Sequence, residues 1–154
     1  MQRVLVLGRG GAGKSTFARS LGEALDLPVV ELDAHFWQPD LKPLSAREWT
    51  ETQARLASAP RWVMDGDLGP YDVLQPRLEA ADAVFVLDFP LWRCAWRSLR
   101  RGRERGDYWR WVVAYRRTYL PRITQQIAPV QEKVAVRILR RPSEVNEALA
   151  AARC

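Results

Sequence analysis

Residues 8–16 are the part of this sequence best suited to bind a phosphate group. They read Gly-Arg-Gly-Gly-Ala-Gly-Lys-Ser-Thr and fill every position of the pattern G-x-x-x-x-G-K-[ST]. Glycine lets a loop turn tightly and point its backbone N–H groups at phosphate oxygens. The lysine of this pattern reaches the β- and γ-phosphates of a nucleotide, and the hydroxyl after it ligates Mg²⁺. The residues expected to contact the nucleotide are therefore Gly8, Gly10, Gly11, Ala12, Gly13, Lys14, Ser15 and Thr16.

The sequence on either side of this loop fits the same interpretation. Residues 4–7 are a short apolar run, as in a buried parallel strand. After the loop, Phe17, Leu21 and Leu25 recur at four-residue spacing, which predicts one face of a helix. Strand, glycine loop and helix in that order are the context in which the pattern binds phosphate. The alternative is a glycine-rich turn that binds nothing.

Three aspartates, Asp33, Asp65 and Asp88, each end an apolar run. The carboxyl ends of parallel strands border the ligand crevice of an open sheet, so all three should lie near the loop. Asp88 is expected to help hold Mg²⁺ together with Ser15. Asp33 could orient or deprotonate an acceptor hydroxyl. The alternative for each aspartate is a helix cap or a turn residue, where aspartate is common.

Residues beside two of these aspartates are candidates to contact the substrate. Asp65 is followed by Gly66, which permits close backbone approach to a ligand, and then by Asp67. His35 and Trp37 follow Asp33, although a single histidine more often has a structural role. Two further tryptophans, Trp92 and Trp96, together with Trp62, are more simply interpreted as core, and Trp109 joins Trp37 as a possible ligand contact.

Short apolar runs alternate with helical segments through the whole chain. Strands are predicted at 4–7, 28–33, 61–65, 83–88 and 133–139, and helices at 45–58, 70–81, 90–100, from 107 and from 143. The segment 70–81 is the weakest helix because Pro76 interrupts it. This alternation predicts an α/β fold with a parallel sheet and helices on both faces. Its 154 residues suit a single domain, 1–154.

Positive charge is concentrated in residues 93–122. This window holds ten arginines against Glu104 and Asp107, a net charge of +8, while the whole chain carries +6. Arginine can bind a phosphate group through two parallel hydrogen bonds, whereas lysine cannot. The segment 100–107, bounded by glycine, resembles a small lid that closes over phosphates. An ordinary turn between two helices is an alternative interpretation of the same segment. Nucleic acid is a second possible partner for the arginines, and a solvated helix face a third.

Composition excludes several classes of protein. An apolar fraction of 47% and a charged fraction of 27% are typical of soluble globular domains. No apolar run approaches the ~20 residues of a membrane helix, and no signal peptide opens the chain, so a cytoplasmic protein is expected. The two cysteines, Cys94 and Cys154, show neither metal-type nor C-x-x-C spacing.

These residues together resemble the adenylate-kinase-like P-loop proteins known as DNA topology modulation proteins, within the nucleoside monophosphate kinase and shikimate kinase group. The likeness runs nearly end to end. It rests on residues 8–16, 32–37, 62–67 and 86–90 and on the paired arginines at 97–105 and 116–117.

The resemblance implies a three-layer fold with a five-stranded parallel sheet in the order 2-3-1-4-5 and ATP bound in the loop. It also implies that lid arginines clasp the transferred phosphoryl group, here Arg97, Arg100 and Arg101, with Arg103 and Arg105 as further candidates. Two departures stand out. Asp67 takes the place where these proteins tend to have asparagine, and the lid is short.

The sequence therefore predicts an ATP- and Mg²⁺-dependent P-loop kinase acting on a small hydroxyl or phosphate acceptor that is nucleoside- or nucleotide-like. Lys14, Asp33, Arg97 and Arg101 are the expected catalytic residues, and Arg100 is expected to contact the nucleotide. Two alternatives stay open: a nucleic-acid-associated ATPase or regulator that uses residues 93–122, and a nucleotide-binding protein without turnover. A monomer and a homodimer are both compatible with the sequence.

Overall fold

The computed structural model describes residues 1–40, 42–102 and 106–153. Its strands are β1 (Arg3–Gly8), β2 (Val29–Glu31), β3 (Trp62–Asp65), β4 (Ala83–Leu87) and β5 (Ala135–Leu139). They form one five-stranded sheet in the order β2-β3-β1-β4-β5, and every pairing is parallel. The fold class is the one that the sequence pattern predicted, and the strand order is the one that the family resemblance implied.

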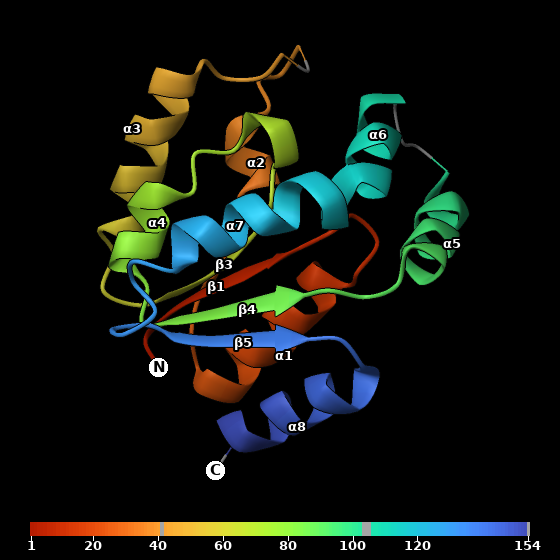
Figure 1. Cartoon of the computed structure of the whole chain (residues 1–154). Coiled ribbons are helices and arrows are strands. Elements are labelled where there is room, and N and C mark those ends of the chain that lie inside the picture. Colours follow the sequence, from red (N-terminus) through yellow and green to blue (C-terminus); the bar gives the residue numbers. More distant parts are fainter. Residues whose placement is uncertain (41, 103–105, 154) are drawn as a thin grey trace.

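Helices cover both faces of this sheet (Figure 1). They are α1 (Lys14–Leu25), α2 (Asp33–Phe36), α3 (Ala46–Ala57), α4 (Gln75–Ala80), α5 (Leu91–Arg101), α6 (Gly106–Ala114), α7 (Leu120–Ile127) and α8 (Pro142–Ala152). A 3₁₀ turn spans Gly69–Tyr71, and a π-helical segment, Tyr115–Tyr119, joins α6 to α7. The predicted helix 70–81 is thus shorter, because Pro76 lies in the first turn of α4 rather than inside a longer helix.

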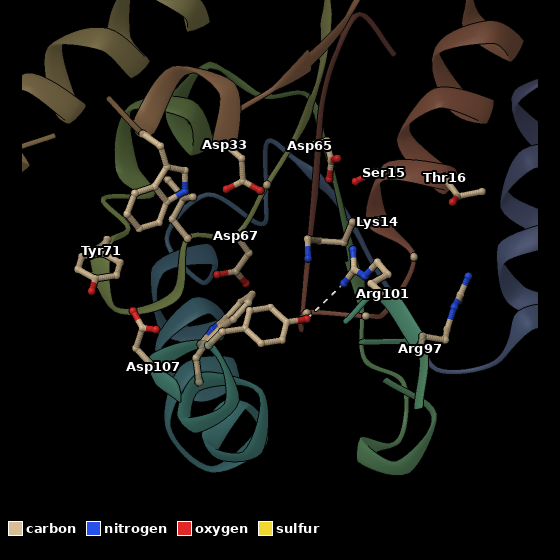
Figure 2. Close-up of a pocket in the computed structure, with 18 of the residues that line it drawn as sticks. Lys14, Ser15, Thr16, Asp33, Asp65, Asp67, Tyr71, Arg97, Arg101 and Asp107 are labelled. Atoms are coloured by element: carbon tan, nitrogen blue, oxygen red, sulfur yellow. Dashed lines mark hydrogen bonds between the residues drawn. The ribbon is translucent and has the colours of Figure 1, made fainter. Parts of the chain in front are cut away.

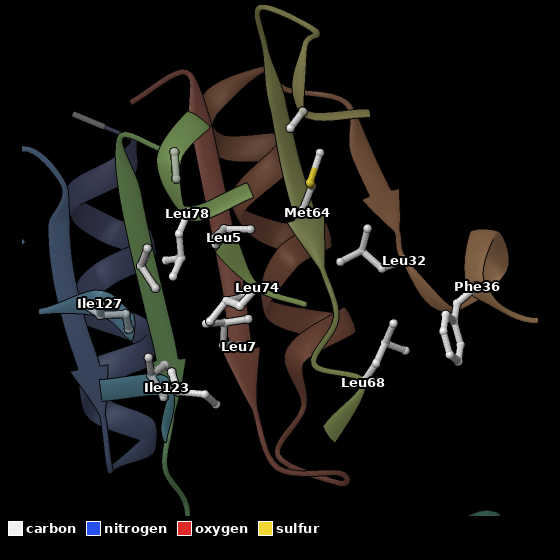
Figure 3. Close-up of a cluster of buried hydrophobic side chains, with 14 of the residues drawn as sticks. Leu5, Leu7, Leu32, Phe36, Met64, Leu68, Leu74, Leu78, Ile123 and Ile127 are labelled. Carbon is white, nitrogen blue, oxygen red and sulfur yellow. The ribbon is translucent and has the colours of Figure 1, made fainter. Parts of the chain in front are cut away.

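Alternating side chains of β1 divide the core into two layers. Val4 and Val6 pack with Phe17 of α1 and with α8 on one face. Leu5 and Leu7 point to the other face, where they join residues of β3, α4 and α7 (Figure 3). Because both faces are covered, β1 is almost uniformly apolar, as a parallel strand should be.

The helix boundaries follow local chemistry. Ser45 caps α3 by accepting a hydrogen bond from the Glu48 backbone N–H, and the Glu48 carboxylate accepts from the Ser45 N–H in return. Gly102 ends α5 in a left-handed conformation with φ 71°. Both features agree with the sequence pattern.

Helix α5 differs from its prediction in the face that it buries. Cys94 and Ser98 are fully buried against the loop, whereas Trp92 is 72% exposed and Trp96 63%. The assignment of these two tryptophans to the core was wrong, while Trp62 is buried as expected. The i, i+4 spacing of Trp92 and Trp96 shows only that they share a face of α5. The face that is buried carries small residues, because these allow the helix to approach the loop closely.

Candidate functional site

The glycine loop connects β1 to α1 and forms the floor of the site. Gly13 stands at the N-cap of α1 with φ 90°, a conformation that favours glycine, so the first turn of the helix opens directly onto the loop. The side chain of Lys14 lies over the loop, where its Nζ donates a hydrogen bond to the Arg9 carbonyl at 3.2 Å. Lys14 Nζ is also 5.6 Å from the ring centroid of Trp111. Helix-terminal N–H groups and a nearby ammonium are the groups that bind phosphate.

A cavity of about 740 Å³ opens above this loop. Its lining includes most of the predicted site residues: Gly10, Gly11, Gly13, Lys14, Ser15, Thr16, Asp33, Trp37, Asp65, Gly66, Asp67, Arg97, Arg100 and Arg101. Five described candidates lie outside the lining, namely Gly8, Ala12, His35, Asp88 and Trp109. Arg103 and Arg105, the other two lid candidates, lie outside the described residues. Segments far apart in the sequence therefore converge on one site.

Helices α5 and α6 bring positive charge and a tyrosine to the loop. The guanidinium of Arg97 lies over Gly13, so that a Cβ on Gly13 would be 3.0 Å from Arg97 Nη1. The ring of Tyr108 packs directly on Gly10. Its hydroxyl is 2.6 Å from Ser98 Oγ and accepts a hydrogen bond from Arg101 Nη2 at 3.3 Å (Figure 2). Arg97 and Arg101 are thus held next to the phosphate-binding loop.

Carboxylates gather on the opposite side of the cavity. Figure 2 shows Asp33, Asp67 and Asp107 on one side of Lys14, with Arg97 and Arg101 on the other. Asp33 begins α2 directly after β2, and Asp67 follows β3. The cavity therefore has a cationic side above the loop and an acidic side at the ends of β2 and β3.

Asp65 is the carboxylate associated with Ser15. It ends β3, it is 6% exposed, and its Oδ1 is buried without a hydrogen-bond partner. Burial raises the pKa of the Asp65 carboxyl, while hydrogen bonding to Ser15 and the charge of Lys14 oppose that rise. A hydroxyl and a carboxylate side by side at a phosphate loop are hard oxygen donors of the kind that Mg²⁺ prefers.

Asp88, the predicted partner of Ser15, has a different environment. Its carboxylate is buried and pairs with Arg116 Nε at 2.8 Å and, more loosely, with Arg140 Nε at 3.6 Å. In the part of the chain that the structure describes, no three metal-type side chains cluster around a possible ion. The structure brings Asp65, rather than Asp88, to the serine, and a metal role for Asp88 stays a prediction.

Asp67 is fixed in the cavity wall by two donors. The Tyr115 hydroxyl donates to its Oδ2 at 3.1 Å, and the Gly69 N–H donates to its Oδ1 at 3.0 Å. Burial, together with the negative charge of Asp72, raises the pKa of Asp67 to about 6. Burial and the neighbouring Asp67 also raise the pKa of Tyr115 well above its ordinary value, so its hydroxyl remains a donor.

Several site residues were not predicted from the sequence. Tyr71, Tyr108 and Trp111 line the cavity, and Tyr115 supports Asp67 from behind. The spacing of Tyr108, Trp111 and Tyr115 is the signal that could have found them, since it places three aromatic rings along one side of a continuous helix. Trp37 does line the cavity and lies 6.0 Å from Tyr71, whereas Trp109 lies outside its lining.

His35 is exposed and lies outside the cavity lining, so the structure does not bring it to the other candidates. Its role as a substrate contact stays a prediction. Across the described ranges, no helix has both the length and the apolar character needed to cross a membrane.

Comparison with known proteins gives matches at the level of structure. No family model matches the chain, and no curated protein sequence is significantly similar to it. A shikimate kinase from Acinetobacter baumannii, solved in complex with shikimate, aligns with a TM-score of 0.64 at 16% identity, over 98% of this chain and 90% of that one. A gluconokinase from Sinorhizobium meliloti 1021 aligns with a TM-score of 0.58 at 21% identity, over 98% and 91%.

A deoxyadenosine kinase from M. mycoides, solved with bound dCTP, aligns with a TM-score of 0.52 at 13% identity over 96% of both chains. None of these three structures is described as a DNA topology modulation protein, so that narrower resemblance remains a prediction. Identities this low establish the fold alone. The chain has the fold of the P-loop kinases: a five-stranded parallel sheet in the order 2-3-1-4-5 with helices on both sides.

Proposed function

We propose that this protein is an ATP-dependent kinase that transfers the γ-phosphoryl group to a small hydroxyl or phosphate acceptor, nucleoside- or nucleotide-like. The observation that carries the proposal is the divided cavity, with Lys14 and Arg97 above the glycine loop and Asp33 facing them from the opposite side. The cationic side, with Lys14 and Arg97, suits the phosphates of a donor nucleotide. The side that carries Asp33 suits the hydroxyl group of an acceptor. Phosphoryl transfer needs this kind of positioning and charge stabilisation more than covalent chemistry.

Each side chain has a defined task in this proposal. The loop amides and Lys14 hold the β- and γ-phosphates, and Arg97 and Arg101 stabilise the charge that develops on the transferred group. Arg100, which lines the cavity and also lies 5.9 Å from the Trp96 ring, contacts the nucleotide. Asp33 orients the acceptor hydroxyl and accepts its proton.

The residues around Ser15 fit a magnesium ion. The Ser15 hydroxyl would ligate it and Asp65, whose Oδ1 is otherwise buried without a partner, would hold its water ligands. Bound there, Mg²⁺ neutralises phosphate charge. We assign this task to Asp65 because Asp88 is engaged by two arginines. We further propose membership of the DNA topology modulation group and a cytoplasmic location, both from the sequence.

The test is transfer from γ-labelled ATP to a panel of nucleosides, nucleotides, sugars and small hydroxy acids. Lys14→Ala should abolish both tight ATP binding and transfer, whereas Lys133→Ala, a matched change at an exposed lysine, should alter neither. If ATP binds and no acceptor is phosphorylated, the kinase proposal fails and a binding protein without turnover remains.

One observation favours a second candidate, a nucleic-acid-associated regulator. The exposed face of α5 carries Trp92, Trp96 and Arg100, and single strands are commonly bound by exposed aromatic rings next to arginine. This candidate predicts binding of single-stranded DNA or RNA that weakens steeply with salt. Fluorescence anisotropy with a labelled oligonucleotide at two salt concentrations measures it, and absence of binding at low salt excludes it.

A further inference from the structure

Asp67 lies on the acceptor side of the cavity and makes no ion pair with any of the residues that the structure describes. It is 7% exposed and lines the cavity. The cations that act on it most strongly are Lys14 and Arg77. Arg77 is fully buried outside the cavity lining, and it is bound to Asp72 at 2.5 Å and to Gln53. Because Asp72 already neutralises the charge of Arg77, Lys14 is the described cation with the strongest influence on Asp67.

Binding of ATP changes this balance. In the proposed kinase, Lys14 turns its ammonium to the β- and γ-phosphates, and Asp67 then faces the acceptor with its charge uncompensated. The carboxylate cannot turn away, because the Tyr115 hydroxyl and the Gly69 N–H each hold one of its oxygens. Each of those oxygens retains a second lone pair for a donor from the cavity.

The surfaces around Asp67 favour uncharged polar groups. Trp111 lines the cavity, and its ring packs against Gly69 beside Asp67. Tyr71 and Trp37 also line the cavity, with their rings packed edge to face. A hydroxyl group can donate a hydrogen bond to the Asp67 carboxylate, whereas an ionised phosphate or carboxylate has no proton to donate to Asp67 and is repelled by it.

We propose that Asp67 selects the acceptor, and that the acceptor is an uncharged polyhydroxy compound, a nucleoside or a sugar, rather than a phosphorylated or carboxylated one. This proposal rests on the proposed kinase function and narrows it. A second negative charge about 5 Å from Asp67 in a partly buried site lowers affinity by about two orders of magnitude. Discrimination of that size is sufficient to define a substrate class.

The transfer step balances without any further reactant. The acceptor hydroxyl oxygen forms a bond to the γ-phosphorus of ATP, and the bond from that phosphorus to the β–γ bridging oxygen breaks. The hydroxyl proton passes to Asp33, and ADP leaves with the bonding electron pair.

The experiment compares matched acceptors at pH 8, uridine with uridine 5′-monophosphate and glucose with gluconate. For the unaltered protein, kcat/KM for the uncharged member of each pair should be at least about 100-fold higher. Asp67→Asn should reduce this ratio to within about tenfold, because asparagine can accept from Gly69 and donate to Tyr115 without carrying charge. Glu23→Gln, the same change at an exposed position of α1, should leave the ratio unaltered.

A preference of the unaltered protein for the charged members, or a ratio that Asp67→Asn leaves unchanged, would overturn the proposal. Folding of the variant is verified by its near-ultraviolet circular dichroism. If no acceptor is phosphorylated, the kinase proposal fails by itself, and binding of the same pairs to ATP-loaded protein is measured by calorimetry. If the unaltered protein binds uridine and glucose more tightly than their charged counterparts, and Asp67→Asn abolishes this preference, the inference is still supported. If the unaltered protein binds neither uridine nor glucose, the inference is refuted.

Discussion

Asp67 should make the stability of this protein fall as the pH rises. Its folded-state pKa is about 6, against 3.8 for an ordinary aspartate. The folded protein therefore holds this proton more tightly than the unfolded chain does. The resulting stabilisation is fully present below pH about 3.8 and is lost as the pH rises through about 6. At pH 8 the ionised carboxylate costs the folded state about 3 kcal/mol relative to its protonated form.

Asp67→Asn removes this titration while keeping both hydrogen-bond partners, Tyr115 and Gly69. The same linkage gives a smaller cost at pH 5, so between pH 5 and pH 8 the variant should gain on the order of 1 kcal/mol over the unaltered protein. Titrating groups that do not interact with Asp67 cancel in this difference. Burial of the carboxylate means that solvent screening should reduce the effect little.

The assay is urea unfolding at the two pH values, followed by tryptophan fluorescence in buffer containing EDTA, for both proteins. An aspartate with an ordinary pKa is fully ionised at pH 5 and above, so its replacement would give the same stability difference at both pH values. That result would refute the assignment of Asp67 as a buried, unpaired carboxylate.

Three further predictions concern the neighbours of this site. Tyr115→Phe removes a donor from the buried carboxylate of Asp67 and should cost about 1–3 kcal/mol in urea unfolding, more at pH 8 than at pH 5. Arg77→Ala should cost about 3–5 kcal/mol, because it leaves the largely buried Asp72 without its partner. Arg97→Ala should lower kcat by about 10²–10³ with a much smaller change in the KM for ATP, as measured by steady-state kinetics.

A matched control exists for both arginine changes. Arg47 is exposed and pairs with Glu51 at 3.0 Å on the surface of α3. Arg47→Ala should change the free energy of unfolding by less than about 1 kcal/mol and should leave kcat unaltered. If Arg47→Ala lowers the free energy of unfolding as much as Arg77→Ala does, the buried Arg77–Asp72 pair contributes no more to stability than an exposed arginine. If Arg97→Ala raises KM alone, Arg97 binds nucleotide rather than stabilising the transition state.

The sequence was most informative where local chemistry and topology act together. The glycine pattern between an apolar strand and an amphipathic helix predicted the loop, and the carboxyl ends of parallel strands meet at one edge. This is why Asp33 and Asp65 both reach the cavity. Asp88 also ends a strand, but Arg116 and Arg140 come from distant segments, and their approach to it depends on packing that no local pattern records.

The aromatic residues show a second limit of sequence reasoning. Trp92 and Trp96 are spaced like core residues, yet only small residues of α5 could approach the loop closely enough to be buried there. In contrast, Tyr108, Trp111 and Tyr115 do show a regular helical spacing, but that spacing does not indicate that the Tyr115 hydroxyl reaches Asp67. That contact depends on tertiary packing between residues that are 48 positions apart in the sequence.

The packing of Tyr108 on Gly10 has a consequence for how this loop can evolve. The phosphate-binding pattern leaves position 10 open to any residue, and the backbone of Gly10 is not among those with positive φ. Its glycine is needed because a Cβ would collide with the Tyr108 ring. Positions 10 and 108 should therefore vary together among relatives. A small residue at position 108 would leave room for the Cβ of an alanine at position 10. Gly13 has no such compensating partner, since its constraint lies in its own backbone.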